Sequence, residues 1–165
     1  MEALPDFSPT ALLRLFVERG VDFVVIGGVA LVVHGSSRFT RELDVCYATD
    51  PTNLDLLGSA LVELQARLRG VEEDVPFVPD GRALRRTGIL CLETREGPVD
   101  LLFQPAGAPP YDELRRRAVR MDLGGFGVLV ASLDDLAAIK RAAGRPIDLI
   151  DLEEIEVIRR LTESG

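Results

Sequence analysis

The stretch that decides the fold, residues 21–44, reads VDFVVIGGVALVVHGSSRFTRELD. It opens with a β-branched apolar run at residues 21–26, which predicts a buried strand. Gly27 and Gly28 end this run, and residues without side chains let the backbone come close to a ligand. Residues 29–34 then predict a short helix, whose free N–H groups and positive dipole end suit a phosphate. Taken alone, the same arrangement is also that of an ordinary tight turn.

Two carboxylates stand two residues apart at the end of this stretch. Residues 39–47 predict a second strand, and the alternation of a strand puts Glu42 and Asp44 on the same face. Unpaired acids this close repel each other, and a divalent cation removes that cost. Mg²⁺ prefers oxygen ligands of this kind and also holds substrate phosphates. The alternative interpretation is a polar strand face open to water.

A third carboxylate, Asp100, interrupts an otherwise apolar run at residues 99–103. Together with residues 87–94, this run predicts a β-hairpin. Burying a lone charge is costly, so Asp100 needs a partner. That partner is either an arginine, in an ion pair, or a metal ion shared with Glu42 and Asp44.

Helices are predicted around these strands by their start signals, which are Ser8-Pro9, Asp50-Pro51 and Ser132. The expected helices run over residues 9–19, 50–68, 111–121, 132–144 and 145–161, and a further strand runs over residues 126–130. The fold class is therefore α+β, with a central mixed β-sheet, flanking helices and a helical C-terminal end. We expect a single domain over residues 1–165, with its core at about 21–104 and its helical part at about 109–165.

The composition excludes several classes of protein. Of the 165 residues, 47% are hydrophobic and 28% are charged, which is a globular composition. The net charge of −8 argues against broad binding to DNA or RNA, since phosphate affinity comes mainly from Lys and Arg. Arginines do cluster at residues 85–86 and 115–117, either as a solvated face or as a local patch for an anionic substrate. Cys46 and Cys91 have no metal-type spacing and make no disulfide framework.

The N-terminus lacks the basic and apolar blocks of a signal peptide. The longest apolar stretch, residues 21–33, is shorter than the roughly 18 residues that a membrane span needs. We therefore expect a cytoplasmic protein with no membrane partner.

Taken together, the glycine pair, the acids Glu42 and Asp44 and the later acid Asp100 resemble the DNA polymerase β-type nucleotidyltransferase superfamily. A narrower likeness is to the small bacterial nucleotidyltransferases of the AbiEii/AbiGii toxin type. The motifs that carry it are GGVA at 27–30, HG at 34–35, RFTRELD at 38–44 and the C-terminal stretch 136–151.

This resemblance implies a nucleotidyltransferase fold and the transfer of a nucleoside monophosphate from an NTP to a hydroxyl group. Gly27, Gly28 and the N–H groups after them would hold the triphosphate. Glu42 and Asp44 would hold two Mg²⁺ ions, with Mn²⁺ as an alternative. Asp100 would bind the second ion and help to deprotonate the attacking hydroxyl. The two ions would clamp the attacking and leaving oxygens of an in-line displacement.

The resemblance also implies further nucleotide-binding residues, namely His34, Ser36, Arg38, Thr40, Lys140 and Arg145. Each basic residue has a structural alternative, because lysine and arginine also pair with nearby acids. Asp148 and Asp151 are available to Lys140 and Arg145 in this way. His34, the only histidine, also serves to close the short helix.

The acceptor stays open between a small molecule, a protein and a tRNA end, although the acidic charge counts against tRNA. Acceptor contacts are expected from residues 71–86 and 104–121. The family usually has Asp where this chain has Glu42, whose extra methylene displaces the carboxylate. Two alternatives therefore stand beside the enzyme: a toxin–antitoxin partner with weak or no catalysis, and a module that binds NTP without turnover. A homodimer that covers the cleft is a further expectation.

Overall fold

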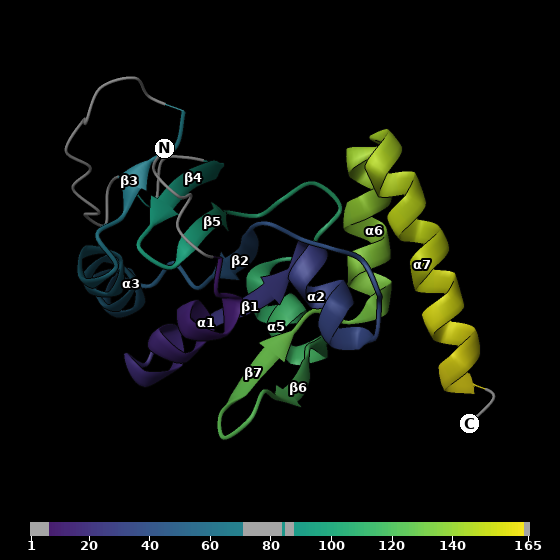
Figure 1. Ribbon diagram of the computed structural model, residues 1–165, viewed down its shortest axis with the longest axis horizontal. Coiled ribbons are helices and arrows are strands. Elements are labelled where there is room, and N and C mark those ends of the chain that lie inside the picture. The colour runs from purple at the N-terminus through teal and green to yellow at the C-terminus, as the bar shows by residue number, and fades with distance from the viewer. Residues whose placement is uncertain (1–6, 71–83, 85–87, 164–165) are drawn as a thin grey trace.

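The computed structural model describes residues 7–70, 84 and 88–163, and Figure 1 shows how their elements are arranged. Within these ranges, seven strands form one mixed sheet in the order β3-β4-β5-β2-β1-β7-β6. The strands are β1 (Phe23–Ile26), β2 (Leu43–Tyr47), β3 (Arg67–Leu68), β4 (Ile89–Thr94), β5 (Gly97–Leu102), β6 (Val119–Asp122) and β7 (Gly127–Val130). The helices are α1 (Pro9–Glu18), α2 (Gly27–His34), α3 (Pro51–Glu63), α5 (Tyr111–Arg117), α6 (Leu133–Ala143) and α7 (Pro146–Glu163). The α+β fold expected from the sequence is confirmed.

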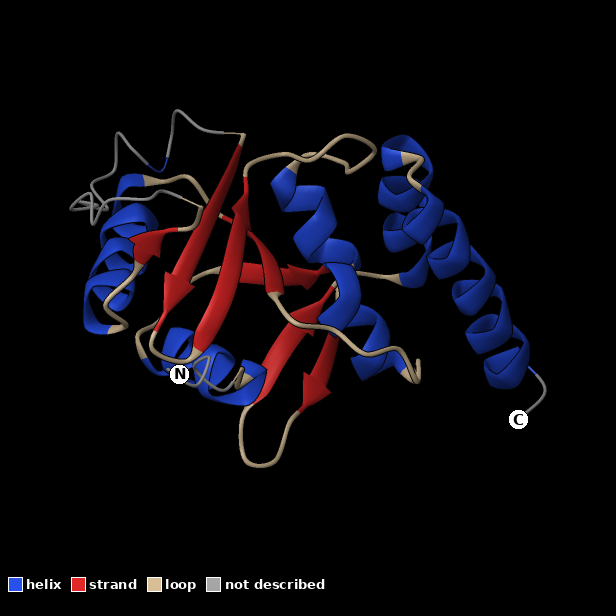
Figure 2. Cartoon of the chain, turned by 45° about the horizontal axis from the view of Figure 1, so that its top comes forward, coloured by secondary structure: helices blue, strands red, loops and turns tan. Residues whose placement is uncertain are grey.

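Strand β1 lies at the centre of the core, because all four of its residues are buried. It pairs antiparallel with β2 and parallel with β7, and β2 in turn pairs parallel with β5. A continuous apolar run of this kind is typical of a strand covered on both faces. Helices α1 and α3 lie towards one end of the sheet, and α6 and α7 lie side by side at the other (Figures 1 and 2).

The predicted helix starts are confirmed by hydrogen bonds from first-turn N–H groups to the side chains of Ser8, Asp50 and Ser132. Just inside α3, the buried Asn53 accepts a hydrogen bond from the backbone N–H of Asp22 at 2.7 Å. Its amide also donates to the carbonyl oxygens of Asp22 and Ala48. One polar side chain therefore ties the start of β1 and the end of β2 to the same helix.

Two predicted helices are wrong at their C-terminal ends. The helix predicted at 50–68 ends at Glu63, because Gln65 takes a left-handed backbone conformation (φ 56°) and the chain then pairs with β4 as β3. The helix predicted at 111–121 ends at Arg117. Its last residues form β6, because the outer edge of β7 offers backbone hydrogen-bond partners to them.

The start of the second predicted strand is also wrong. Strand β2 begins at Leu43 and not at residue 39, since its pairing with β5 starts only there. Phe39 is exposed and its ring lies under the guanidinium of Arg41. The β4–β5 hairpin is confirmed from Ile89 onwards. None of the helices in the described ranges has the length and apolar content needed to span a bilayer.

Candidate active site

Two neighbouring strands bring the predicted acids together. Asp44 in β2 lies opposite Asp100 in β5, because the strands pair in parallel with these residues in register. Glu42 lies just before β2. Carboxylate oxygens of all three residues lie within 4.8 Å of one another. Asp100 is buried, whereas the other two residues are partly open to solvent.

The negative charge of this cluster is only partly compensated. Burial, followed by the charges of Asp100 and Glu42, raises the pKa of Asp44 to about 8, and the charge of Lys140 acts in the opposite direction. A cation that binds these oxygens therefore removes a repulsion already present in the fold. Carboxylate oxygens are the ligands that both Mg²⁺ and Mn²⁺ prefer. The three residues thus fit a divalent metal ion.

Gly27 lets helix α2 begin directly against Asp44. Its φ of +71° lies in the left-handed region that favours glycine. A Cβ atom at this position would lie 2.1 Å from Asp44 Oδ2, so a side chain would displace the carboxylate. At Gly28, a Cβ atom would lie 2.8 Å from Thr40 Oγ1 and 3.4 Å from Arg38 Nη1. The glycine pair therefore allows the first turn of α2 to pack against the acidic cluster.

Arg69 contacts two of the three acids and was missed from the sequence. Its Nη1 donates to Glu42 Oε2 at 3.1 Å, and its Nη2 donates to Asp100 Oδ1 at 2.8 Å. Nη2 also donates to the carbonyl oxygen of Leu92 at 2.9 Å. Arg69 lies in no motif and reaches the acids across β4. The only signal that could have found it is the requirement for a partner of Asp100.

The segment between α2 and β2 is fastened by its own side chains. His34 Nε2 lies 2.8 Å from the carbonyl oxygen of Ala131, which ties the end of α2 to the residue after β7, and Gly35 caps the helix. Ser36 Oγ accepts a hydrogen bond from the backbone N–H of Arg38 at 3.0 Å. Thr40 Oγ1 donates to the carbonyl oxygen of Glu42 at 3.2 Å. These contacts hold the segment beside Gly28 and the acidic cluster.

Lys140 and Arg145 pair with the two aspartates of α7. Lys140 Nζ lies 2.8 Å from Asp151 Oδ2 and 3.4 Å from Asp148 Oδ1. Arg145 Nε donates to Asp148 Oδ2 at 2.7 Å, and this hydrogen bond lowers the pKa of Asp148 to about 2. Arg38 Nη1 donates to Asp151 Oδ2 at 2.7 Å. Lys140 and Arg145 therefore form the ion pairs with Asp148 and Asp151 that were the structural alternative to phosphate binding. Together with the contact from Arg38, these pairs join α6, α7 and the segment after α2.

A family model described as "Nucleotidyl transferase AbiEii toxin, Type IV TA system" matches residues 11–154. The match includes both glycines and all three carboxylates of the cluster. The chain belongs to the AbiEii nucleotidyltransferase toxin family. No curated protein matches this AbiEii-family chain significantly in sequence.

Two solved structures share the fold of the AbiEii-family chain. The lincosamide antibiotic adenylyltransferase LnuA, solved with lincomycin bound, has a TM-score of 0.63 at 14% identity over 93% of this chain and 99% of that chain. ANT(2″)-Ia, solved in complex with adenylyl-2″-tobramycin, has a TM-score of 0.52 at 16% identity over 93% of each chain. At these identities the likeness concerns the fold, and the nucleotidyltransferase fold is confirmed.

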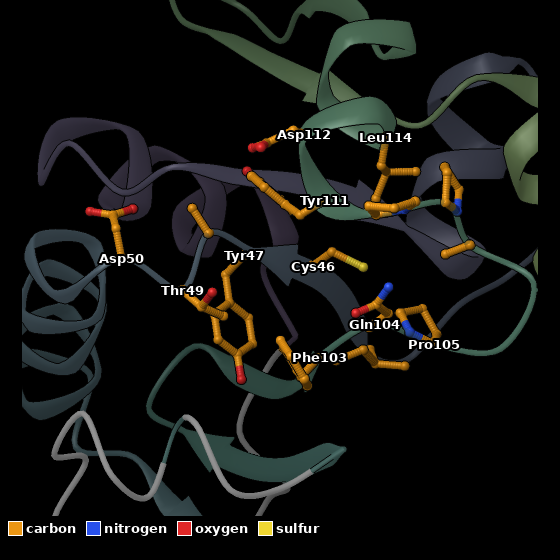
Figure 3. A pocket seen from close by; sticks show the side chains of 15 residues that line it. Cys46, Tyr47, Thr49, Asp50, Phe103, Gln104, Pro105, Tyr111, Asp112 and Leu114 are labelled. Atoms are coloured by element: carbon orange, nitrogen blue, oxygen red, sulfur yellow. The ribbon is translucent and has the colours of Figure 1, made fainter.

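The AbiEii-family chain also has a pocket beyond the acidic cluster, where β2 and β5 end (Figure 3). Its volume is about 340 Å³, and residues 46–50, 102–105, 108–112 and 114 line it. Cys46 pairs with Leu102 in the same parallel register that joins Asp44 to Asp100, so the pocket adjoins the cluster along the same two strands. Asp50 and Asp112 are the charged residues in this lining, among the described residues.

Proposed function

We propose that this protein transfers a nucleoside monophosphate from an NTP to a hydroxyl acceptor in the cytoplasm, with Mg²⁺ as the cofactor. One observation carries the proposal: three carboxylates within metal-binding distance of one another lie against a helix that begins with two glycines. Bound metal would neutralise charge on the attacking and leaving oxygens of an in-line displacement. The family match supports the same activity.

The chain's own residues would divide the remaining work. Glu42, Asp44 and Asp100 would hold the metal. The N–H groups of Gly27 and Gly28 would lie against the triphosphate, where the positive end of α2 favours negative charge.

The other nucleotide-binding candidates lie on the α2, α6 and α7 side of the cluster. Arg38 and Thr40 border Gly28, as the close approach of their side chains to it indicates. Arg145 has an exposed side chain, and its pKa is raised by its hydrogen bond to Asp148 and, more weakly, by the charges of Asp44 and Glu42. We assign these three residues and Lys140 to the phosphates, and His34 and Ser36 to the support of the segment that carries them.

We assign the hydroxyl acceptor to the pocket in Figure 3. In-line displacement puts the attacking oxygen opposite the leaving pyrophosphate, and the basic residues that we assign to the phosphates do not line this pocket. Apolar side chains such as Phe103, Pro109 and Leu114 dominate the lining, and its charges are negative. A small neutral or cationic molecule suits this lining better than a tRNA end. The expected acceptor contacts at residues 104–121 fall partly here, whereas those at 71–83 and 85–86 lie outside the described residues.

The test is to measure Mg²⁺-dependent NTP binding and pyrophosphate release by the wild type and by Asp44→Asn. The substitution keeps the shape of the side chain and removes a metal-binding oxygen and its charge. Asp55→Asn, on the exposed face of α3, is the matched control. We expect binding and release in the wild type and the control and at least a hundredfold loss of release in Asp44→Asn. Equal release by all three proteins would contradict the proposal.

A second function, binding of a protein partner in a toxin–antitoxin pair, is favoured by the surface of α7. Ile150, Val157 and Leu161 are exposed large apolar residues spaced at helical intervals on this helix. Ile150→Glu would then abolish co-purification with the product of the adjoining gene, while Asp44→Asn would keep it. The alternative protein partner is a second copy of the chain, which would form a homodimer. Light scattering detects such a dimer from the molar mass in solution.

A further inference from the structure

The guanidinium of Arg69 bridges two of the three carboxylates of the acidic cluster. It is hydrogen-bonded to Glu42 Oε2 and Asp100 Oδ1 at once, at 3.1 and 2.8 Å. Nη2 also donates to the carbonyl oxygen of Leu92, which fixes the plane of the guanidinium group. The planar guanidinium suits such bridging of two acids, which a lysine could not do with the same geometry. Asp44 is left out of this arrangement.

The sheet carries Arg69 to this position. Its backbone N–H donates to the carbonyl oxygen of Cys91 in β4 at 3.0 Å. Cys91 in turn lies opposite Asp100 in the β4–β5 pairing. The side chain therefore extends over β4 from a backbone that is itself held to the sheet. At the far end it meets Glu42, whose side chain is one methylene longer than that of an aspartate.

Space limits what else the cluster holds. The guanidinium of Arg69 already occupies one oxygen of Glu42 and one oxygen of Asp100, and its Nε lies 3.9 Å from Glu93 Oε2. A Mg²⁺ ion bound to Glu42 Oε2 or Asp100 Oδ1 would lie about 2.0–2.1 Å from that oxygen. The guanidinium that donates to both oxygens competes with such an ion for them.

We propose that this site takes one divalent cation, centred on Asp44, and that Arg69 supplies the second positive centre in place of a second metal ion. The inference rests on the proposed function, since it concerns the same site. It departs from the two ions that the family resemblance implies. Arg69 is a positioning residue here, because it acts by holding Glu42 and Asp100 and by excluding an ion.

The experiment counts Mn²⁺ bound per chain by electron paramagnetic resonance, with the α,β-methylene analogue of each of the four NTPs present at saturation. The proteins are the wild type, Arg69→Met, Asp44→Asn and the control Arg67→Met, which changes an exposed arginine two residues earlier. We expect one ion in the wild type and in Arg67→Met, and two ions in Arg69→Met.

Two ions in the wild type would overturn the inference, and this result does not depend on the folding of any variant. One ion in both the wild type and a folded Arg69→Met protein would overturn it as well. A wild type that binds no more Mn²⁺ and nucleotide than Asp44→Asn would instead refute the proposed function. Failure of the further inference is therefore separable from failure of the function on which it rests.

Discussion

Gly27 lies so close to Asp44 that one added carbon would collide with its carboxylate, with 2.1 Å between the new Cβ and Oδ2. We expect Gly27→Ala to displace Asp44 and to reduce Mg²⁺-dependent NTP binding at least tenfold. The φ of +71° adds strain of about 1 kcal/mol for any residue with a side chain. Isothermal titration calorimetry measures the binding, and urea unfolding measures the stability.

Gly35→Ala is the matched control, because Gly35 also has a positive φ but no atom lies within 4 Å of its added Cβ. It should lose a similar amount of stability and keep NTP binding. If both variants lose binding equally, strain in the segment around α2, and not contact with Asp44, is the cause.

The raised pKa of Asp44 predicts how stability depends on pH in the metal-free protein. The folded state keeps the Asp44 proton up to about pH 8, whereas the unfolded chain releases it near its ordinary value of 3.8. The folded state therefore binds more protons between these values, and the free energy of unfolding falls as the pH rises through them. The decrease in the free energy of unfolding that Asp44 causes should be at least about 1 kcal/mol, which corresponds to a pKa shift of one unit.

Asp44→Asn removes this titration, so the stability profile should flatten and the variant should exceed the wild type near pH 8. Urea unfolding in the presence of EDTA, in steps between about pH 5 and pH 8, measures both profiles. Asp148 titrates below this window, with its pKa at about 2. A wild-type profile that stays flat or rises would show that Asp44 is ionised without a metal.

Lys140→Met should destabilise the protein by about 3 kcal/mol, because Asp148 and Asp151 have no exposed side-chain surface and lose a cation that contacts both. Arg141→Met, the next residue and exposed, should change stability by less than about 0.5 kcal/mol. Thermal unfolding compares the two. NTP affinity, measured in parallel at a temperature where both are folded, reports whether Lys140 also contacts phosphate.

Ala108→Trp should fill the pocket and leave NTP binding unchanged, since Ala108 lines the pocket that we assign to the acceptor. Transfer of labelled nucleotide to small hydroxylated amines should fall at least tenfold. Ala106→Trp, in the same loop but exposed and outside the lining, should behave as the wild type. Weaker NTP binding in Ala108→Trp would assign the pocket to the nucleotide instead.

Local signals made much of the fold and site predictable. The helix starts depend on capping side chains next to their own helices, and the glycine pair and Glu42-Leu43-Asp44 follow one another in the sequence. Asp100 was identified because a charge in an apolar strand needs a partner. Register then placed it opposite Asp44.

Contacts across the sheet were not predictable in this way. The bridge from Arg69 to Glu42 and Asp100 depends on β3 pairing beside β4, and β3 itself was predicted as helix. Likewise β6 exists because the edge of β7 is available. Residues 119–122 (Val, Arg, Met, Asp) do alternate, but four residues are too few to distinguish a short strand from the end of the preceding helix. Tertiary pairing decided these two segments, as it does for short strands in general.

The parallel pairing of Asp44 with Asp100 has a consequence for how the protein is made. All of α3 and β4 lies between the two strands in the chain, so the acids meet only after that long segment has been closed into a loop. A ribosome releases β2 well before β5. A nascent or truncated chain that stops short of β5 thus carries Glu42 and Asp44 but lacks Asp100, and its metal site is incomplete. For a protein of a toxin family, the ability to bind the metal and to transfer a nucleotide would therefore appear only once the sheet is complete.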